Sequence, residues 1–163
     1  MLYVCTRCLA IAQLIQAELA PIGITVEIKA FSGLVLTSRD ATRGEPFDIA
    51  WDGWFADYPD PSDFLNQFFD GTSIKATGNN DLSYFDDPVY NRRLEAAAQL
   101  SGPRRYLAYA ALDADLTRKA APAVPLWNFA EQDFFSARIG NGCKVYQPIY
   151  GVDLAALCLG HRR

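Results

Sequence analysis

The sequence predicts an α/β fold in which helices flank a mixed sheet, and three patterns indicate it. Apolar residues recur at helical spacing over residues 7–20, and a Pro-Ile-Gly turn ends that helix. Apolar and polar residues then alternate over residues 24–28, as in a half-buried strand. A second alternating strand, residues 47–52, runs into a loop that ends at Asp60 and Pro61, a pair typical of a helix start. Helix–turn–strand and strand–loop–helix are both steps of an α/β fold.

The remaining helices are indicated by their starts and by their apolar faces. A short helix over residues 33–43 ends before Gly44 and Pro46. The helix after Pro61 carries four large apolar residues on one face, and we expect that face to be core. Asp87 and Pro88 repeat the cap-plus-proline start, and a longer helix follows over residues 103–119.

Composition and charge limit the classes of function. With 163 residues, 50% of them hydrophobic, the chain is large enough for one domain with a real core. The net charge of −4 and the scattered basic residues offer no basic face, so we expect no nucleic-acid partner. The pair Arg104 and Arg105 is predicted to be solvated surface. No apolar run is long enough to cross a bilayer, and polar residues interrupt the N-terminal apolar stretch, unlike in a signal peptide.

One loop, residues 53–61, combines aromatic rings with a carboxylate. Asp57 lies between Trp54 and Tyr58, and a carboxylate beside rings that exclude water can hold a cationic amine. We therefore predict a ligand-binding site made by Trp54, Ala56, Asp57 and Tyr58. The alternative is that Asp57 only caps a turn while the two rings belong to the core.

Catalysis is not expected. The sequence contains no nucleophile elbow, phosphate-binding loop or histidine-based triad, and its one histidine, His161, lies in the tail. Asp60 and Asp63 lie where the N-terminus of a helix stabilises carboxylates without any function. We expect neither an enzymatic activity nor a cofactor.

The same loop resembles the extracellular solute-binding proteins of peptide-type ABC importers (solute-binding family 5). In that family a Gly-Trp-x-x-Asp-Tyr-x-(Asp/Glu)-Pro run recurs, and the residues that fit it here are Gly53, Trp54, Asp57, Tyr58, Asp60 and Pro61. Further matches follow in the family's order. They are Gly-Ile-x-Val at residues 23–26, a proline-led helix at Pro88, and Ala-Pro-x-x-Pro-Leu at residues 121–126, which in the family leads into a strand. The resemblance spans roughly residues 9–159.

The resemblance implies an architecture and a partner set. Residues 1–163 would form the second, C-terminal lobe of a two-lobe (type II) periplasmic-binding-protein fold, and the chain would begin inside a longer protein. Residues 136–163 would pack on the missing first lobe, so the isolated lobe should tend to self-associate through their apolar side chains. The implied ligand is a peptide or amine-bearing small molecule whose amino group meets Asp57. The implied protein partner is an ABC permease.

The location that the resemblance implies is the periplasmic or extracellular face of the cell membrane. A rival hypothesis from another class is a free-standing protein-interaction domain that uses the exposed cleft face to bind a protein.

The four cysteines form two local pairs. Cys5 and Cys8 are compatible with half a zinc site, a redox dithiol or chance. Zinc needs four ligands and His161 lies in the tail, so we expect no metal. Cys143 and Cys158 flank a loop, and in an oxidising compartment we predict that a disulfide joins them. Closing a loop of that size would stabilise the fold by roughly 3 kcal/mol.

Overall fold

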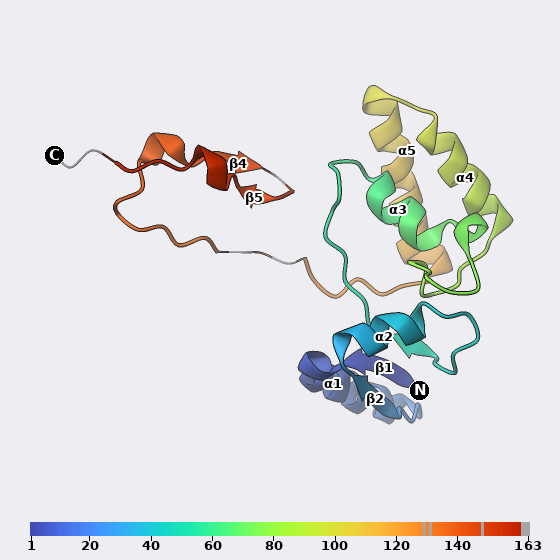
Figure 1. Cartoon of the computed structure of the whole chain (residues 1–163). Coiled ribbons are helices and arrows are strands. Elements are labelled where there is room, and N and C mark those ends of the chain that lie inside the picture. Colours follow the sequence, from blue (N-terminus) through green and yellow to red (C-terminus); the bar gives the residue numbers. More distant parts are fainter. Residues whose placement is uncertain (129, 131, 148, 161–163) are drawn as a thin grey trace.

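The computed structural model of the chain describes residues 1–128, 130, 132–147 and 149–160. Its elements separate into three parts: a sheet unit with α1 and α2, a helical unit of α3, α4 and α5, and a C-terminal arm that leads away from both (Figure 1). In chain order the elements are β1 (Leu2–Cys5), α1 (Leu9–Leu19), β2 (Ile28–Phe31), α2 (Gly33–Asp40), β3 (Ile49–Ala50), α3 (Ser62–Phe69), α4 (Pro88–Ala98), α5 (Gly102–Asp115), β4 (Tyr146–Gln147) and β5 (Gly151–Val152).

The sheet unit is built around β1. The strand order is β2-β1-β3 and both pairings are parallel, with Leu2 opposite Ile28 on one side and Ile49 on the other. Leu2, Tyr3 and Val4 are almost completely buried, as expected for a central strand covered on both faces. The antiparallel pair β4–β5 lies in the arm, so the chain contains both kinds of strand pairing. The fold class is α/β, as the sequence predicts.

The second strand begins later than the alternation of residues 24–28 suggests. It starts at Ile28, because the neighbouring strand β1 begins at Leu2, which is the partner of Ile28. Val26 is nevertheless buried, and its carbonyl accepts a hydrogen bond of 2.6 Å from the Gln16 side chain. Alternation therefore predicted the burial of Val26 correctly but not that of Ile24, which is 47% exposed, and the strand itself forms only where β1 is present as a partner.

The strand expected near residues 121–127 is not formed in the described residues. The chain turns at Ala121 (φ 47°) after a π-helical turn and then runs back toward the sheet unit. There Trp127 packs its ring against that of Trp51, with 5.2 Å between the centroids. The segment thus returns to the edge of the sheet that carries β3, but through a ring contact and without strand pairing.

The sheet unit and the helical unit each have a hydrophobic cluster of their own. One is formed by the buried residues Leu2, Val4, Ala12 and Val26, and the other by Leu65, Leu94, Ala97, Tyr109, Leu112 and Leu116. The helix starts that the sequence predicts are present: the Asp87 carboxylate accepts the backbone N–H of Val89 at 2.7 Å, so it caps α4.

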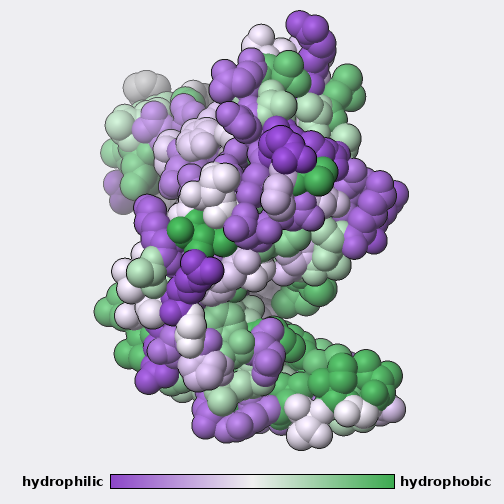
Figure 2. Space-filling model, turned by 90° about the vertical axis from the view of Figure 1, so that its right-hand side faces the viewer, coloured by the Kyte–Doolittle hydropathy of each residue, from purple (hydrophilic) through white to green (hydrophobic). Residues whose placement is uncertain are grey.

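The surface differs between the two units. Figure 2 shows a mostly polar helical unit above and a more apolar flank below, where the sheet unit lies. In that unit α1 and the turn after it leave Leu14 and Ile22 more than half exposed, at 59% and 70%. Among the described residues, none of the helices has the length and apolarity that crossing a membrane requires.

A buried acid ends α2. Asp40 is 2% exposed, and its Oδ1 atom has no hydrogen-bond partner in the part of the chain that is described. The loop that contains Asn79 and Tyr84 is fixed to this end of α2. The Tyr84 hydroxyl donates to the Asp40 carbonyl at 2.9 Å, and the Asn79 side-chain amide donates to the Ala41 carbonyl at 2.9 Å. Burial, assisted by the negative charge of Asp52, raises the pKa of Asp40 to about 6.

This acid should make the fold less stable as the pH rises from about 4 to about 6. The folded chain retains the Asp40 proton over that range and the unfolded chain does not, so stability is lost with increasing pH. We expect Asp40→Asn to be more stable than the wild type at pH 7 by about 2–3 kcal/mol, and equal to it near pH 4. Urea denaturation at several pH values measures this difference. Parallel pH profiles for the two proteins would contradict it, and Asp113→Asn on the exposed face of α5 serves as the control.

Candidate ligand-binding site

The aromatic–acidic loop connects β3 to α3 and is fixed at its start by the sheet. The Trp51 backbone N–H donates to the Tyr3 carbonyl at 3.0 Å, which continues the β3–β1 pairing by one residue. After Gly53 the chain leaves the sheet and crosses to the helical unit, where α3 begins (Figure 1). The loop therefore bridges the two units.

Asp63, in the first turn of α3, holds the middle of this loop. Its side chain is completely buried, and its Oδ2 atom accepts two hydrogen bonds, from the Asp57 backbone N–H at 2.6 Å and from Trp54 Nε1–H at 3.3 Å. A buried carboxylate is costly unless it is hydrogen-bonded, and these two donors offset part of that cost at Oδ2, while Oδ1 has no hydrogen-bond partner among the described residues. Asp63 was expected to stabilise the helix start only. Its role in the loop was missed because the spacing Asp-Pro-Ser-Asp already explains it as a capping sequence.

Trp54 contributes to packing as well as to the loop surface. Its ring meets that of Phe68 edge to face, with 5.5 Å between centroids, and the residue is half-buried. Trp54 is thus held against α3 by two interactions: the ring contact with Phe68 and the hydrogen bond to Asp63. For Trp54, the structure shows the packing role, and its part in a ligand site stays a prediction.

Asp60 and Arg105 fasten the end of the loop to the helical unit. Arg105 donates from Nε to Asp60 Oδ2 at 2.8 Å and from Nη2 to Oδ1 at 2.7 Å, a two-point ion pair. Its Nη1 group also donates to the carbonyls of Ala97 and Ala98 at the end of α4. These bonds from Arg105 hold the pKa of Asp60 well below its usual range. The prediction that Arg105 is solvated surface was wrong, because its partner lies 45 residues away.

Asp57 presents its side chain to solvent, as the sequence predicts. The residue is exposed, and within the described ranges its carboxylate has no hydrogen-bond or ion-pair partner. Its backbone is held on both sides: the N–H by Asp63, and the carbonyl by the Tyr150 hydroxyl at 2.9 Å. Tyr58 is 43% exposed, with its hydroxyl 3.3 Å from Ser62 Oγ. The loop therefore offers one unpaired carboxylate beside an exposed phenol ring.

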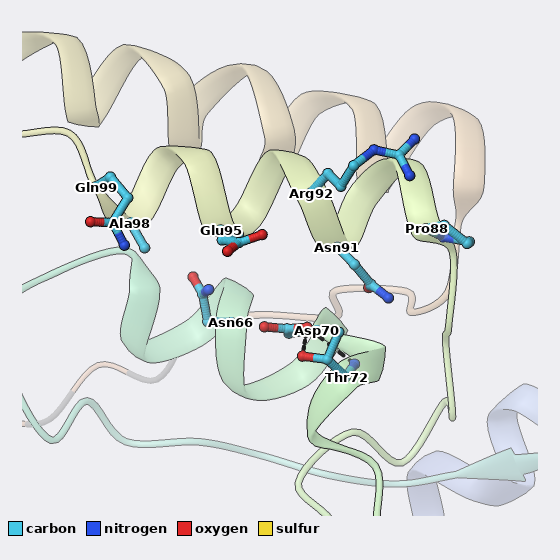
Figure 3. Close-up of a pocket in the computed structure, with 9 residues that line it drawn as sticks. All are labelled: Asn66, Asp70, Thr72, Pro88, Asn91, Arg92, Glu95, Ala98 and Gln99. Atoms are coloured by element: carbon cyan, nitrogen blue, oxygen red, sulfur yellow. Dashed lines mark hydrogen bonds between the residues drawn. The ribbon is translucent and has the colours of Figure 1, made fainter.

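A separate groove of about 550 Å³ lies between α3 and α4 (Figure 3). The side chains that line it are mostly polar: Asn66, Asp70, Thr72, Pro88, Asn91, Arg92, Glu95, Ala98 and Gln99. Several of these polar groups already have partners in the chain, including Asn66, which accepts from the Tyr109 hydroxyl at 2.8 Å. Asn91 bonds to the Gly71 N–H and to Asp86, and Asp70 accepts from Thr72. None of the residues predicted for the ligand site lines this groove.

The cysteines form two disulfides. Cys143 and Cys158 are joined, as predicted, with 5.5 Å between their Cα atoms. Cys5 and Cys8, whose state the sequence left open, are also joined, at the point where β1 passes into α1. Among the described residues, no three Cys, His, Asp or Glu side chains gather as a metal site.

Comparison with known proteins identifies the family that the loop resembles. Residues 5–76, which include this loop, match the family described as bacterial extracellular solute-binding proteins, family 5 Middle. The resemblance read from the sequence is thereby confirmed over this segment. A search of curated protein sequences returns no match.

Three solved structures of binding proteins share the fold. One is the ABC transporter-associated periplasmic binding protein DppA from Helicobacter pylori in complex with the peptide STSA; its TM-score is 0.64 and its identity 28%, over 77% of this chain and 24% of that one. Another is clavulanic acid biosynthesis oligopeptide binding protein 2, with a TM-score of 0.63 and 23% identity, over 72% and 23%. The third is MppA, a periplasmic murein tripeptide binding protein in its unliganded open form, with a TM-score of 0.58 and 22% identity, over 74% and 22%.

These likenesses establish the architecture as part of a type II periplasmic-binding-protein fold. The chain spans about a quarter of the length of the structures that it matches.

Removing the Asp63 carboxylate should loosen the loop and the start of α3. Asp63→Ala leaves two donors, the Asp57 N–H and Trp54 Nε1–H, without their acceptor, so we expect a loss of roughly 2–4 kcal/mol in the free energy of unfolding. Urea denaturation followed by tryptophan fluorescence measures it. Asp113→Ala, a change of the same size at an exposed position, should cost less than about 0.5 kcal/mol. Equal stability of the two variants would contradict the role given to Asp63.

Proposed function

We propose that this chain is the ligand-binding second lobe of an ABC-importer solute receptor for peptides or similar amine-bearing solutes. The observation that carries the proposal is the exposed, unpaired carboxylate of Asp57 on a loop whose backbone is fixed from both sides. The segment around it matches family 5 solute-binding proteins, and one structural relative is described as a peptide complex. The location that accompanies this function is the periplasmic or extracellular face of the cell membrane.

The chemistry of the loop suits a cationic amine. Asp60 and Asp63 lie close to Asp57 in sequence, but both are already used: Asp60 in its ion pair with Arg105, and Asp63 by two N–H donors. Asp57 is the carboxylate of the three whose side chain is left for a ligand. An ammonium group can form a charge-assisted hydrogen bond with it, and the neighbouring rings of Trp54 and Tyr58 limit the access of water.

The rest of the receptor is part of the same proposal. Because the chain spans about a quarter of the binding proteins that it matches, the opposite wall of the ligand site would come from a first lobe. Residues 1–163 would then act as one lobe, with residues 136–163 packed on the first lobe and a permease as the protein partner. No observation favours the rival hypothesis of a free-standing interaction domain, nor a catalytic role for the described carboxylates.

The proposed role of Asp57 predicts a loss of affinity that depends on the ligand's amino group. In the natural full-length protein, Asp57→Asn should weaken binding of a tetrapeptide such as Ser-Thr-Ser-Ala by tenfold or more, because a buried ammonium loses its counter-charge. The same peptide with an acetylated amino terminus should bind the wild type and the variant equally weakly. Isothermal titration calorimetry measures both, with Glu18→Gln on the exposed side of α1 as the control. Unchanged affinity of Asp57→Asn for the free-amine peptide would reject the role.

The apolar surface of the C-terminal region predicts self-association of the isolated chain. Phe134 is 90% exposed and Leu154 is 77% exposed, and both would be covered by a first lobe in the proposed receptor. We expect a concentration-dependent dimer in analytical ultracentrifugation, shifted toward monomer by the double variant Phe134→Ser, Leu154→Ser. Leu34→Ser, at an 89% exposed position on α2, should not shift it. A strict monomer at the highest accessible concentration would contradict this expectation.

A further inference from the structure

The C-terminal arm is a clamped hairpin. We define it as the described residues between 138 and 160. Its outer end is closed by the Cys143–Cys158 disulfide and by a bridge between Ile139 and Leu159. Gly140 permits this closure, because a Cβ atom there would lie 3.1 Å from Cys158 Sγ and 3.3 Å from Cys143 Sγ. A lone two-stranded hairpin is marginal in water, so the disulfide is what keeps β4 and β5 together.

A hydrogen bond from one side chain of the arm, Tyr150, reaches the ligand loop. Tyr150 lies immediately before β5, and its hydroxyl donates to the Asp57 carbonyl at 2.9 Å across 93 residues of sequence. Within the described ranges this is the one hydrogen bond between the arm and residues 1–128. The Tyr150 residue is 77% exposed, so the contact is made by the hydroxyl and does not depend on burial of the ring.

This bond completes the fixation of Asp57. The residue's N–H is held by Asp63 and its carbonyl by Tyr150, so the peptide groups on both sides of its Cα are restrained. With both fixed, the direction of the side chain is restricted to the rotamers of one backbone conformation. A carboxylate already oriented toward its ligand binds it with a smaller loss of conformational entropy than a mobile one.

We propose that Tyr150 is a positioning residue of the ligand site, and that the Cys143–Cys158 disulfide serves to hold it against Asp57. The proposal rests on the proposed function, in which Asp57 receives the amino group of the ligand. The arm then contributes to recognition without contacting the ligand: its hydroxyl sets the orientation of the carboxylate, and the covalent closure keeps that hydroxyl at a high local concentration beside the Asp57 carbonyl.

The hydrogen bond is tested without a ligand by amide exchange. Tyr150→Phe removes only the hydroxyl, and we expect the backbone amides of residues 54–58 and of Asp60 to exchange at least threefold faster than in the wild type. Tyr146→Phe is the matched control, since Tyr146 lies on the same hairpin, is 66% exposed, and its hydroxyl has no hydrogen-bond partner among the described residues. The double variant Cys143→Ser, Cys158→Ser should reproduce the effect of Tyr150→Phe. Adding Tyr150→Phe to it should cause little further change, because both act on one contact.

A second readout separates positioning from general stability. In the full-length protein, Tyr150→Phe should weaken binding of the free-amine peptide Ser-Thr-Ser-Ala about three- to tenfold and leave binding of its N-acetylated form unchanged. A merely structural effect would weaken both alike. Loop exchange in Tyr150→Phe equal to the wild type, or an equal effect of Tyr146→Phe, would overturn the proposal. If the wild type binds neither peptide, the proposed function falls, whereas the exchange measurement still decides whether Tyr150 orders the loop.

Discussion

The buried carboxylate of Asp63 is the constraint on which the candidate site depends. It lies at the start of α3 with no exposed surface, and it receives the Asp57 N–H and the Trp54 indole N–H. Two residues further along α3, Leu65 enters the helical core. The carboxylate therefore connects the position of the loop to that of the helix, because breaking its two hydrogen bonds would leave buried polar groups without partners.

Three neighbouring acids of this loop perform three different tasks, and their surroundings decide which. Asp63 is buried and accepts from the chain. Asp60 is paired with Arg105, which also holds the end of α4. Asp57 alone of the three faces solvent with its carboxylate unpaired among the described residues. Of the three carboxylates, only that of Asp57 is without a partner among the described residues; Asp63 holds the Asp57 backbone, and Asp60 fastens the end of the loop to the helical unit.

The loop and the residues that flank it also contact segments that are distant in sequence: β1, the segment after α5 and the C-terminal arm. On one side the Trp51 backbone extends the pairing with β1, and its ring meets Trp127 from the segment after α5. On the other side the hydroxyl of Tyr150 reaches the loop from the disulfide-closed arm. We expect that a displacement of either segment would change the position of the loop that carries Asp57. In the proposed receptor, such a connection would link ligand contact energetically to the position of these distant segments.

The sequence by itself determined the features that depend on near neighbours. Asp87 and Pro88 start α4 because a cap and its N–H partners are two or three residues apart, and the helix start after Asp60 follows the same rule. The exposure of Asp57 and the pairing of Cys143 with Cys158 also followed from local pattern.

Only the tertiary structure decided what depends on distant partners: the start of β2 at the partner of Leu2, the ion pair of Arg105 with Asp60, the second role of Asp63, and the bond from Tyr150. A strand needs a neighbouring strand, and an ion pair needs its partner. Local spacing records neither, since these partners meet only when the chain has folded.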